Sequence, residues 1–328
     1  MTTDLLPDRL AALLARWDLP PVESAEPMTG GTNNTLLAVR AGGRSWVLRR
    51  YGNLPADRVR AEHRLLAHVS GLDLPFAVPS PVPTRDGPTV VDDPAGALAL
   101  FRHLPGRPLR RDEPGSASLA GRALAQLDAA LAEVPMALAP VDWRATALGQ
   151  VHTAVGDVAV LADELSALMP GHDGPGWLRS THERADAVAA DLARALPAQL
   201  THGDMAPANL LVEDGRVTAV LDFEIAGADL RAMDLAAGLL QCTGWPEEPG
   251  SAQRVGAFLR AYLDVLPLTR AELDAVPDLL RLRALGSVVW RAGRWRLGQS
   301  TLEEVRERLD AGLALEAALP GWAALAGA

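Results

Sequence analysis

Residues 201–223 read THGDMAPANLLVEDGRVTAVLDF. Two short apolar runs flank an Asp-Gly dipeptide at 214–215, and this arrangement is a strong signal for a β-hairpin. Asp204 and Asn209 precede the hairpin, and Asp222 follows it. Because a hairpin brings its two ends together, we expect these three oxygen-bearing side chains to converge at one spot.

Three converging oxygen ligands suit phosphoryl transfer. The transferred group carries spread negative charge, so a protein mainly supplies positioning and cations. Mg²⁺ prefers oxygen ligands and keeps several waters, so one or two carboxylates and an amide suffice to hold it. A further carboxylate can accept the proton of the attacking hydroxyl. The alternative interpretation is a structural hairpin with solvated polar loops.

The spacing His-x-Asp-x-x-x-x-Asn, followed by Asp-Phe, resembles the catalytic and metal loops of the eukaryotic-type protein kinase superfamily. Gly203 after the histidine resembles the branch that contains aminoglycoside phosphotransferases, choline kinases and type II homoserine kinases. This resemblance implies that ATP and Mg²⁺ are the cofactors, that Asp204 is the catalytic base, and that Asn209 and Asp222 bind the metal. We expect His202 to pack beneath the loop.

The segment after Asp222 is short. Residues 224–231 lead directly into an expected helix that includes Asp234, with no room for the activation segment of a protein kinase. This predicts a small-molecule acceptor. Asp234 resembles the aspartate that braces the catalytic loop in this branch. A helix cap near the N-terminus is the alternative interpretation, and the two are compatible.

The segment from Met28 to Tyr51 predicts a glycine turn followed by a β-hairpin. Its first residues, Gly30, Gly31, Thr32 and Asn33, resemble the loop that covers the nucleotide phosphates in this family. Glycines let backbone N–H groups approach phosphate oxygens closely.

The second strand alternates Val47, Arg49 and Tyr51 on one face. Arg49 stands where kinases place a phosphate-binding lysine, and the chain contains no lysine. Arginine can also clamp phosphate. The expected helix over 58–69 carries Glu62 on its apolar side. We expect Glu62 to pair with Arg49 and count both among the catalytic residues, because a carboxylate that faces a core needs a partner. The alternative is a solvated Glu62 at the edge of the apolar stripe.

The stretch Phe101 to Gly106 resembles the hinge of the family. The resemblance implies that the backbone of Arg102, His103 and Leu104 binds the adenine edge. It also implies that three apolar side chains sandwich the adenine ring, namely Leu37, Val47 and Leu211. Apolar strand residues such as these are also ordinary core residues.

Long alanine- and leucine-rich patterns predict helices over 4–17, 116–133, 145–168, 178–195, 251–265, 271–290 and 301–318. A strand is expected over 98–104. We therefore predict an α+β, protein-kinase-like fold with two lobes. Residues 1–104 form a small β-rich nucleotide-binding lobe, and residues 105–328 form a larger helical lobe for catalysis and substrate binding.

Composition bounds the setting. The net charge is −10, with no clustered basic face, so nucleic acid is not an expected partner. No stretch is long and apolar enough for a membrane span or a signal peptide. The single cysteine, Cys242, excludes a disulfide within the chain and favours a cytoplasmic location. The sequence does not indicate an oligomeric state.

The expected acceptor is an amino alcohol, a hydroxy amino acid such as homoserine, or an aminoglycoside-like molecule. The acidic chain, with Glu224 and Asp229 expected beside the acceptor, favours an acceptor that bears an amine. Two alternative functions stay open. One is a nucleotide-binding pseudokinase with a regulatory role, suggested by the missing lysine, and the other is a metal-dependent hydrolase that uses His202 and Asp204.

Overall fold

The computed structural model describes residues 7–28, 34–145, 147–244 and 248–326. The chain forms two compact units. The first unit comprises residues 1–107 together with two later segments, 137–140 and 211–224. The second unit comprises residues 108–136, 141–210 and 225–328. The functions assigned above to residues 1–104 and 105–328 stay predictions.

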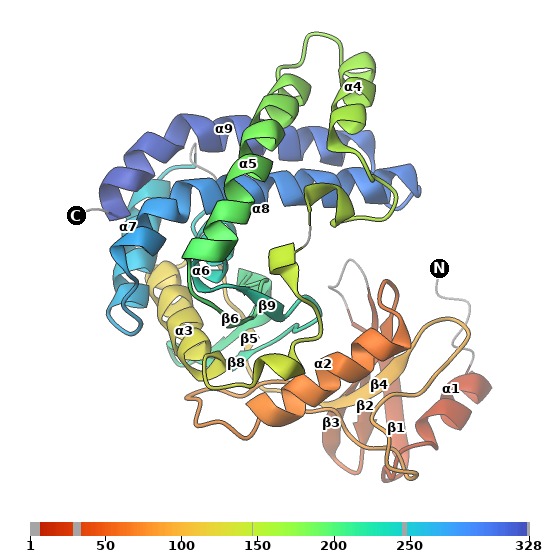
Figure 1. Cartoon of the computed structure of the whole chain (residues 1–328). Helices are drawn as coiled ribbons and strands as arrows, with labels where there is room; N and C mark the ends of the chain where they lie inside the picture. Colours follow the sequence, from red (N-terminus) through yellow and green to blue (C-terminus); the bar gives the residue numbers. More distant parts are fainter. Residues whose placement is uncertain (1–6, 29–33, 146, 245–247, 327–328) are drawn as a thin grey trace. The chain divides into compact units, whose positions relative to one another are not determined.

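The first unit is built on a four-stranded antiparallel sheet in the order β1-β2-β3-β4 (Figure 1). The predicted hairpin is confirmed, because two of these strands are joined by a turn in which Gly42 and Gly43 both have positive φ. Glycine adopts this backbone conformation without a steric cost. The first strand was not predicted, since its sequence VESAEP lacks a clear apolar alternation. The strands are β1 (Val22–Pro27), β2 (Asn34–Ala41), β3 (Arg44–Tyr51) and β4 (Leu98–Arg102).

Two helices bury apolar residues in the first unit. α1 (Pro7–Leu14) leads to Trp17, whose side chain packs with Leu48 and other residues on one face of the sheet. α2 (Ala56–Val69) matches the predicted helix over 58–69 and buries one side of its surface. The buried residues of α2 are Val59, Glu62, His63, Leu65, Leu66 and Val69.

The hairpin that follows Asn209 is also confirmed. β7 (Leu210–Glu213) and β8 (Arg216–Val220) are joined by Asp214 and Gly215, with φ of 50° and 73°. Positive φ at both central residues defines the type I′ turn that two-residue hairpins favour. The backbone of β8 also bonds Ala77, with Val220 N–H donating to the Ala77 carbonyl at 3.0 Å. Asp222 thus follows a strand that is held on both sides within the first unit.

The second unit is mainly helical and contains the long neighbouring helices α8 and α9 (Figure 1). A two-stranded antiparallel sheet of β6 (Ala198–Thr201) and β9 (Gly227–Leu230) lies in this unit, and β5 spans only Arg107–Pro108. The helices are α3 (Ser116–Leu131), α4 (Val158–Leu168), α5 (Gly174–Ala195), α6 (Arg231–Cys242), α7 (Ser251–Leu263), α8 (Arg270–Arg296) and α9 (Leu302–Ala326).

The prediction of one helix over 145–168 is wrong, because α4 begins only at Val158. The preceding residues form a tight loop in which Gly156 has φ of 71° and donates its N–H to the Gly149 carbonyl. A Cβ on Gly149 would lie 2.1 Å from the Gly156 carbonyl oxygen. Asp157 then caps α4 by accepting the N–H groups of Ala159 and Val160.

The described helices include none that is both long enough and apolar enough to cross a lipid bilayer.

Candidate active site

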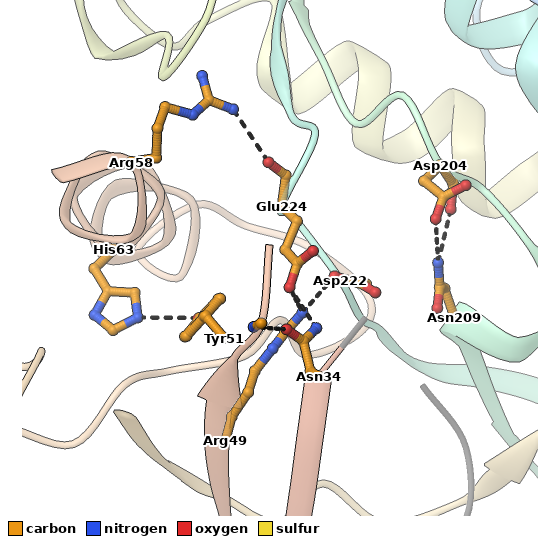
Figure 2. Close-up of polar contacts among 10 residues, drawn as sticks. Asn34, Arg49, Tyr51, Arg58, His63, Asp204, Asn209, Asp222 and Glu224 are labelled. Carbon is orange, nitrogen blue, oxygen red and sulfur yellow. Dashed lines mark hydrogen bonds and ion pairs between the residues drawn. The ribbon is translucent and has the colours of Figure 1, made fainter. Parts of the chain in front are cut away.

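The loop after β6 holds Asp204 in a defined position. Its Oδ2 accepts a hydrogen bond from the Asn209 side-chain amide at 3.1 Å, and the same amide donates to the Asp204 carbonyl at 2.9 Å (Figure 2). Its Oδ1 accepts from the Gln241 side chain of α6 at 2.9 Å. The carboxylate is 35% exposed, so a small molecule can reach it. An oriented and accessible carboxylate is what a general base requires.

Asp234 of α6 clamps this loop from the inside. Its two oxygens accept the backbone N–H groups of His202 and Gly203 at 2.5 and 2.8 Å. The predicted brace is therefore confirmed, whereas the alternative of a helix cap is not, because α6 begins at Arg231 with no side-chain cap. His202 is fully buried, and its Nδ1 accepts the Asp204 N–H, as expected for a residue packed beneath the loop.

A second buried carboxyl group lies behind the brace. Asp128 of α3 is fully buried and accepts a hydrogen bond from the Tyr262 hydroxyl at 2.7 Å. Burial and then the charge of Asp234 raise the pKa of Asp128 well above its usual range. The raised pKa favours the neutral form of Asp128, which reduces charge repulsion with Asp234 beneath the Asp204 loop.

Asp222 and Arg49 form an ion pair in the first unit. The Arg49 Nη2 lies 2.9 Å from Asp222 Oδ1 and also pairs with Glu224, as Figure 2 shows. Asp222 has φ of 65°, a left-handed conformation that aspartate tolerates better than bulky residues. The predicted face of β3 is confirmed, because the Arg49 guanidinium lies 4.6 Å above the Tyr51 ring.

The predicted ion pair between Arg49 and Glu62 is not formed, and Glu62 is not solvated either. Glu62 is only 2% exposed, and its Oε2 has no hydrogen-bond partner among the described residues. Burial raises the pKa of Glu62 to about 8, although Arg49 lowers it. The Arg49 guanidinium is instead neutralised by the two carboxylates that follow β8.

Glu224, rather than Glu62, is the residue that pairs with Arg49. Its side chain pairs with Arg49 and accepts the Asn34 side-chain N–H at 2.5 Å, and its carbonyl accepts from Arg58 of α2 at 3.3 Å. Glu224 is only 6% exposed and Arg49 matches its charge, whereas its position relative to the acceptor stays a prediction. The chemical signal was present in the sequence, because Glu224 stands two residues after Asp222, and a buried carboxylate beside a lone cation pairs with it.

The four residues Gly30, Gly31, Thr32 and Asn33 lie outside the described residues. Arg102, His103 and Leu104 follow β4, where the His103 N–H already donates to the Ser45 carbonyl at 3.1 Å. The phosphate contacts of the first four residues and the adenine contacts of the last three stay predictions.

The structure corrects the assignment of Leu37 to the adenine site. Leu37 lies opposite Leu48 in the β2–β3 ladder, whereas Val47 lies opposite Ala38. Directly paired residues point to the same face, so Leu37 and Val47 face opposite sides of the sheet. Leu37 belongs to the buried core with Trp17 and Leu48. Ala38 is the β2 residue on the Val47 face, and the role of Leu211, which is buried in β7, stays a prediction.

The oxygen atoms of Asn209 and Asp222 suit a metal ion that takes few ligands from the protein. Among the described residues, no group of three or more histidine, cysteine or acidic side chains could hold a metal ion. His202 is fully buried and its Nδ1 accepts the Asp204 N–H, which argues against a hydrolase that uses His202 as a metal ligand. Asn209 uses its amide nitrogen on Asp204, which leaves its Oδ1 available, and Asp222 offers a partly exposed carboxylate. These two residues lie in different units, so their convergence with Asp204 stays a prediction.

The sheet unit with its arginine-carboxylate pair and the helical unit with its braced aspartate define a protein-kinase-like phosphotransferase. The chain belongs to the phosphotransferase enzyme family, which its residues 24–285 match. It is therefore a kinase that acts on a hydroxyl group of a small molecule. This membership argues against a pseudokinase.

Similar proteins agree with this class. A homoserine kinase from Xanthobacter autotrophicus is 29% identical over 311 residues, covering 89% of this chain and 87% of the relative. A microcompartment-associated aminopropanol kinase has a similar structure, with a TM-score of 0.68, 20% identity and coverage of 96% and 98% of the two chains. An amicoumacin kinase has a TM-score of 0.70 at 16% identity, with coverage of 94% and 93%. At these identities, the two structures support the fold alone.

Proposed function

We propose that the chain transfers the γ-phosphoryl group of ATP, with Mg²⁺, to the hydroxyl of a small hydroxy amino acid such as homoserine. The observation that carries the proposal is the geometry of Asp204. Its side chain is partly exposed, its carboxylate is hydrogen-bonded to Asn209 and Gln241, and Asp234 holds the loop that carries it. In this role Asp204 takes the proton of the acceptor hydroxyl while the hydroxyl oxygen attacks the γ-phosphorus of ATP. The bond between this phosphorus and ADP breaks, so the products are ADP and a phosphate ester.

The nucleotide side of the proposal rests on Arg49 and Asp222. Ion pairs with Asp222 and Glu224 hold Arg49, and its forked guanidinium suits phosphate oxygens. Asp222 and Asn209 would hold Mg²⁺, which neutralises charge on the nucleotide phosphates when it is bound. A similar structure was determined with AMP-PNP and Ca²⁺, which supports an ATP-like nucleotide with a divalent cation. Gly30 to Asn33 would cover the phosphates, and Arg102 to Leu104 would bind the adenine edge.

The choice of a hydroxy amino acid follows the relatives. Several curated relatives that cover most of this chain are homoserine kinases, at 27–30% identity. Amino alcohols and antibiotics are the acceptors named for the similar structures, at 16–20% identity. The higher identity favours homoserine as the leading candidate.

The proposal is tested by coupled ADP release with ATP and Mg²⁺. The acceptor panel contains homoserine, choline, an aminopropanol, an aminoglycoside and glucose, and ³¹P NMR identifies each product. We expect homoserine to give the highest kcat/KM and a phosphate monoester as product. A reaction without acceptor measures background ATP hydrolysis. ADP release at the background rate with every acceptor contradicts phosphoryl transfer, and a strong preference for glucose contradicts the proposed acceptor class.

A further inference from the structure

Arg283 of α8 is fixed beside Asp204 within the second unit. Its Nη2 donates a hydrogen bond to the carbonyl of Gly203 at 2.9 Å and lies 3.8 Å from Asp204 Oδ1. Gly203 directly precedes Asp204 and is itself held by Asp234. The guanidinium therefore keeps a constant position relative to the catalytic carboxylate. Any acceptor whose hydroxyl reaches Asp204 comes close to this positive charge.

The charge of Arg283 is weakly matched by its surroundings. By contrast, Arg231 of the same unit is tied closely to a carboxylate, that of Glu272, at 2.7 and 2.9 Å. Among the described residues, Arg283 forms an ion pair with Asp204 alone, at 3.8 Å between Nη2 and Oδ1. No carboxylate of these residues lies within hydrogen-bond distance of its guanidinium. The side chain is 33% exposed. Most of its N–H donors are therefore available to a ligand.

Acidic neighbours do not cancel this charge. Asp229 of β9 interacts electrostatically with Arg283, but burial raises the pKa of Asp229 to about 7, so it is only partly ionised near neutral pH. One oxygen of Asp229 accepts the Leu230 N–H. Asp142, which also interacts with Asp229, is bonded to Arg144. Arg283 thus offers a positive charge to an anionic group on this side of Asp204.

We infer that Arg283 binds a carboxylate of the acceptor and thereby selects hydroxy acids over amino alcohols of the same length. The inference rests on the proposed function, because it places the acceptor hydroxyl at Asp204. A guanidinium recognises a carboxylate through paired N–H···O bonds, and Nη1 and Nε are the donors that Gly203 leaves for this contact. The separation of 3.8 Å allows one short molecule to meet both residues.

The rival explanation is that Arg283 only holds the loop through the Gly203 carbonyl. The two explanations differ in what the loss of the arginine does to different acceptors. A loop support affects every acceptor alike, because it acts on Asp204. A carboxylate contact affects only acceptors that carry a carboxylate, because a site built to bond a polar group discriminates through that bond.

The test compares homoserine with 3-aminopropan-1-ol, which is homoserine without its carboxylate, for the wild type and Arg283→Met. We expect the wild type to prefer homoserine. In the variant, kcat/KM for homoserine falls at least ~10-fold more than for 3-aminopropan-1-ol, mainly through KM. Arg283→Lys keeps the positive charge but lacks the forked guanidinium, so it retains part of the preference for homoserine over 3-aminopropan-1-ol. Arg270→Met, an exposed position on the same helix, serves as the control and keeps the wild-type ratio.

Circular dichroism and thermal unfolding establish that each variant is folded. An unchanged ratio of the two kcat/KM values in Arg283→Met overturns the inference, and so does an equal fall for both acceptors. If Arg283→Met fails to fold, the ratio in Arg283→Lys decides in the same way. Wild-type phosphorylation of 3-aminopropan-1-ol in preference to homoserine overturns the inference but leaves the kinase intact. Phosphorylation of neither acceptor overturns the proposed function as well.

Discussion

Replacing Glu62 with glutamine should make the stability of the protein less sensitive to pH. Burial raises the pKa of Glu62 from 4.5 to about 8 in the folded state. Between these two values the unfolded chain has lost the Glu62 proton while the folded protein keeps it. The wild-type free energy of unfolding therefore falls as the pH rises through this window. Glutamine has the same shape but no proton to lose there, so the variant lacks this contribution.

The size of the effect follows from the shift. Each pH unit inside the window lowers the free energy of unfolding by about 1.4 kcal/mol. The largest loss of wild-type stability that Glu62 causes at pH 7 is therefore about 3 kcal/mol. Any constant effect of burying an amide cancels when two pH values are compared. We expect the difference in free energy of unfolding between Glu62→Gln and the wild type to widen by about 2 to 3 kcal/mol from pH 5 to pH 7.

Urea unfolding at pH 5, 6 and 7 measures this difference. Asp57→Asn is the matched control, because Asp57 lies on the same helix with its side chain 95% exposed. We expect the control to run parallel to the wild type across the series. If Glu62→Gln also runs parallel to the wild type, Glu62 is ionised in the folded protein, and the description of its buried environment is wrong.

Two further predictions concern the nucleotide. Asp222→Ala removes the carboxylate proposed for the metal and should weaken Mg²⁺-dependent ATP binding at least ~10-fold, and equal affinities in calorimetry contradict this role. Arg49→Ala should raise KM for ATP and lower kcat, whereas Arg49→Lys retains part of the activity because a point charge still reaches phosphate. Wild-type kinetics in both Arg49 variants contradict a phosphate contact.

Local sequence signals predicted the frame of the fold. The Asp-Gly dipeptide at 214–215 specified its hairpin, because a two-residue turn requires two positive φ values. The alternation in β3 correctly placed Arg49 and Tyr51 on one face. The prediction of a helix over 145–168 was wrong at its start. The alanine-rich composition favours a helix there, but the close approach of Gly149 and Gly156 forms a loop instead.

The contacts around the site depend on pairings that local patterns do not encode. Arg283 reaches Gly203 across 80 positions of sequence, and Gln241 reaches Asp204 across 37. Apolar periodicity predicts that α8 buries one side, but it does not predict which polar residue contacts the loop that carries Asp204. The face of Leu37 likewise depends on the register of β2 against β3, which a shift of one residue would reverse.

The most direct test of the account is the rate of phosphoryl transfer from ATP to homoserine by Asp204→Asn under single-turnover conditions. Asparagine keeps the size and most of the polarity of the side chain but cannot accept the acceptor proton. With Mg·ATP and homoserine in place, the account predicts that the wild type forms the phosphate ester. It also predicts that Asp204→Asn forms it at least ~100-fold more slowly while its affinity for ATP is retained. Transfer by Asp204→Asn at the wild-type rate contradicts the central claim that Asp204 is the catalytic base.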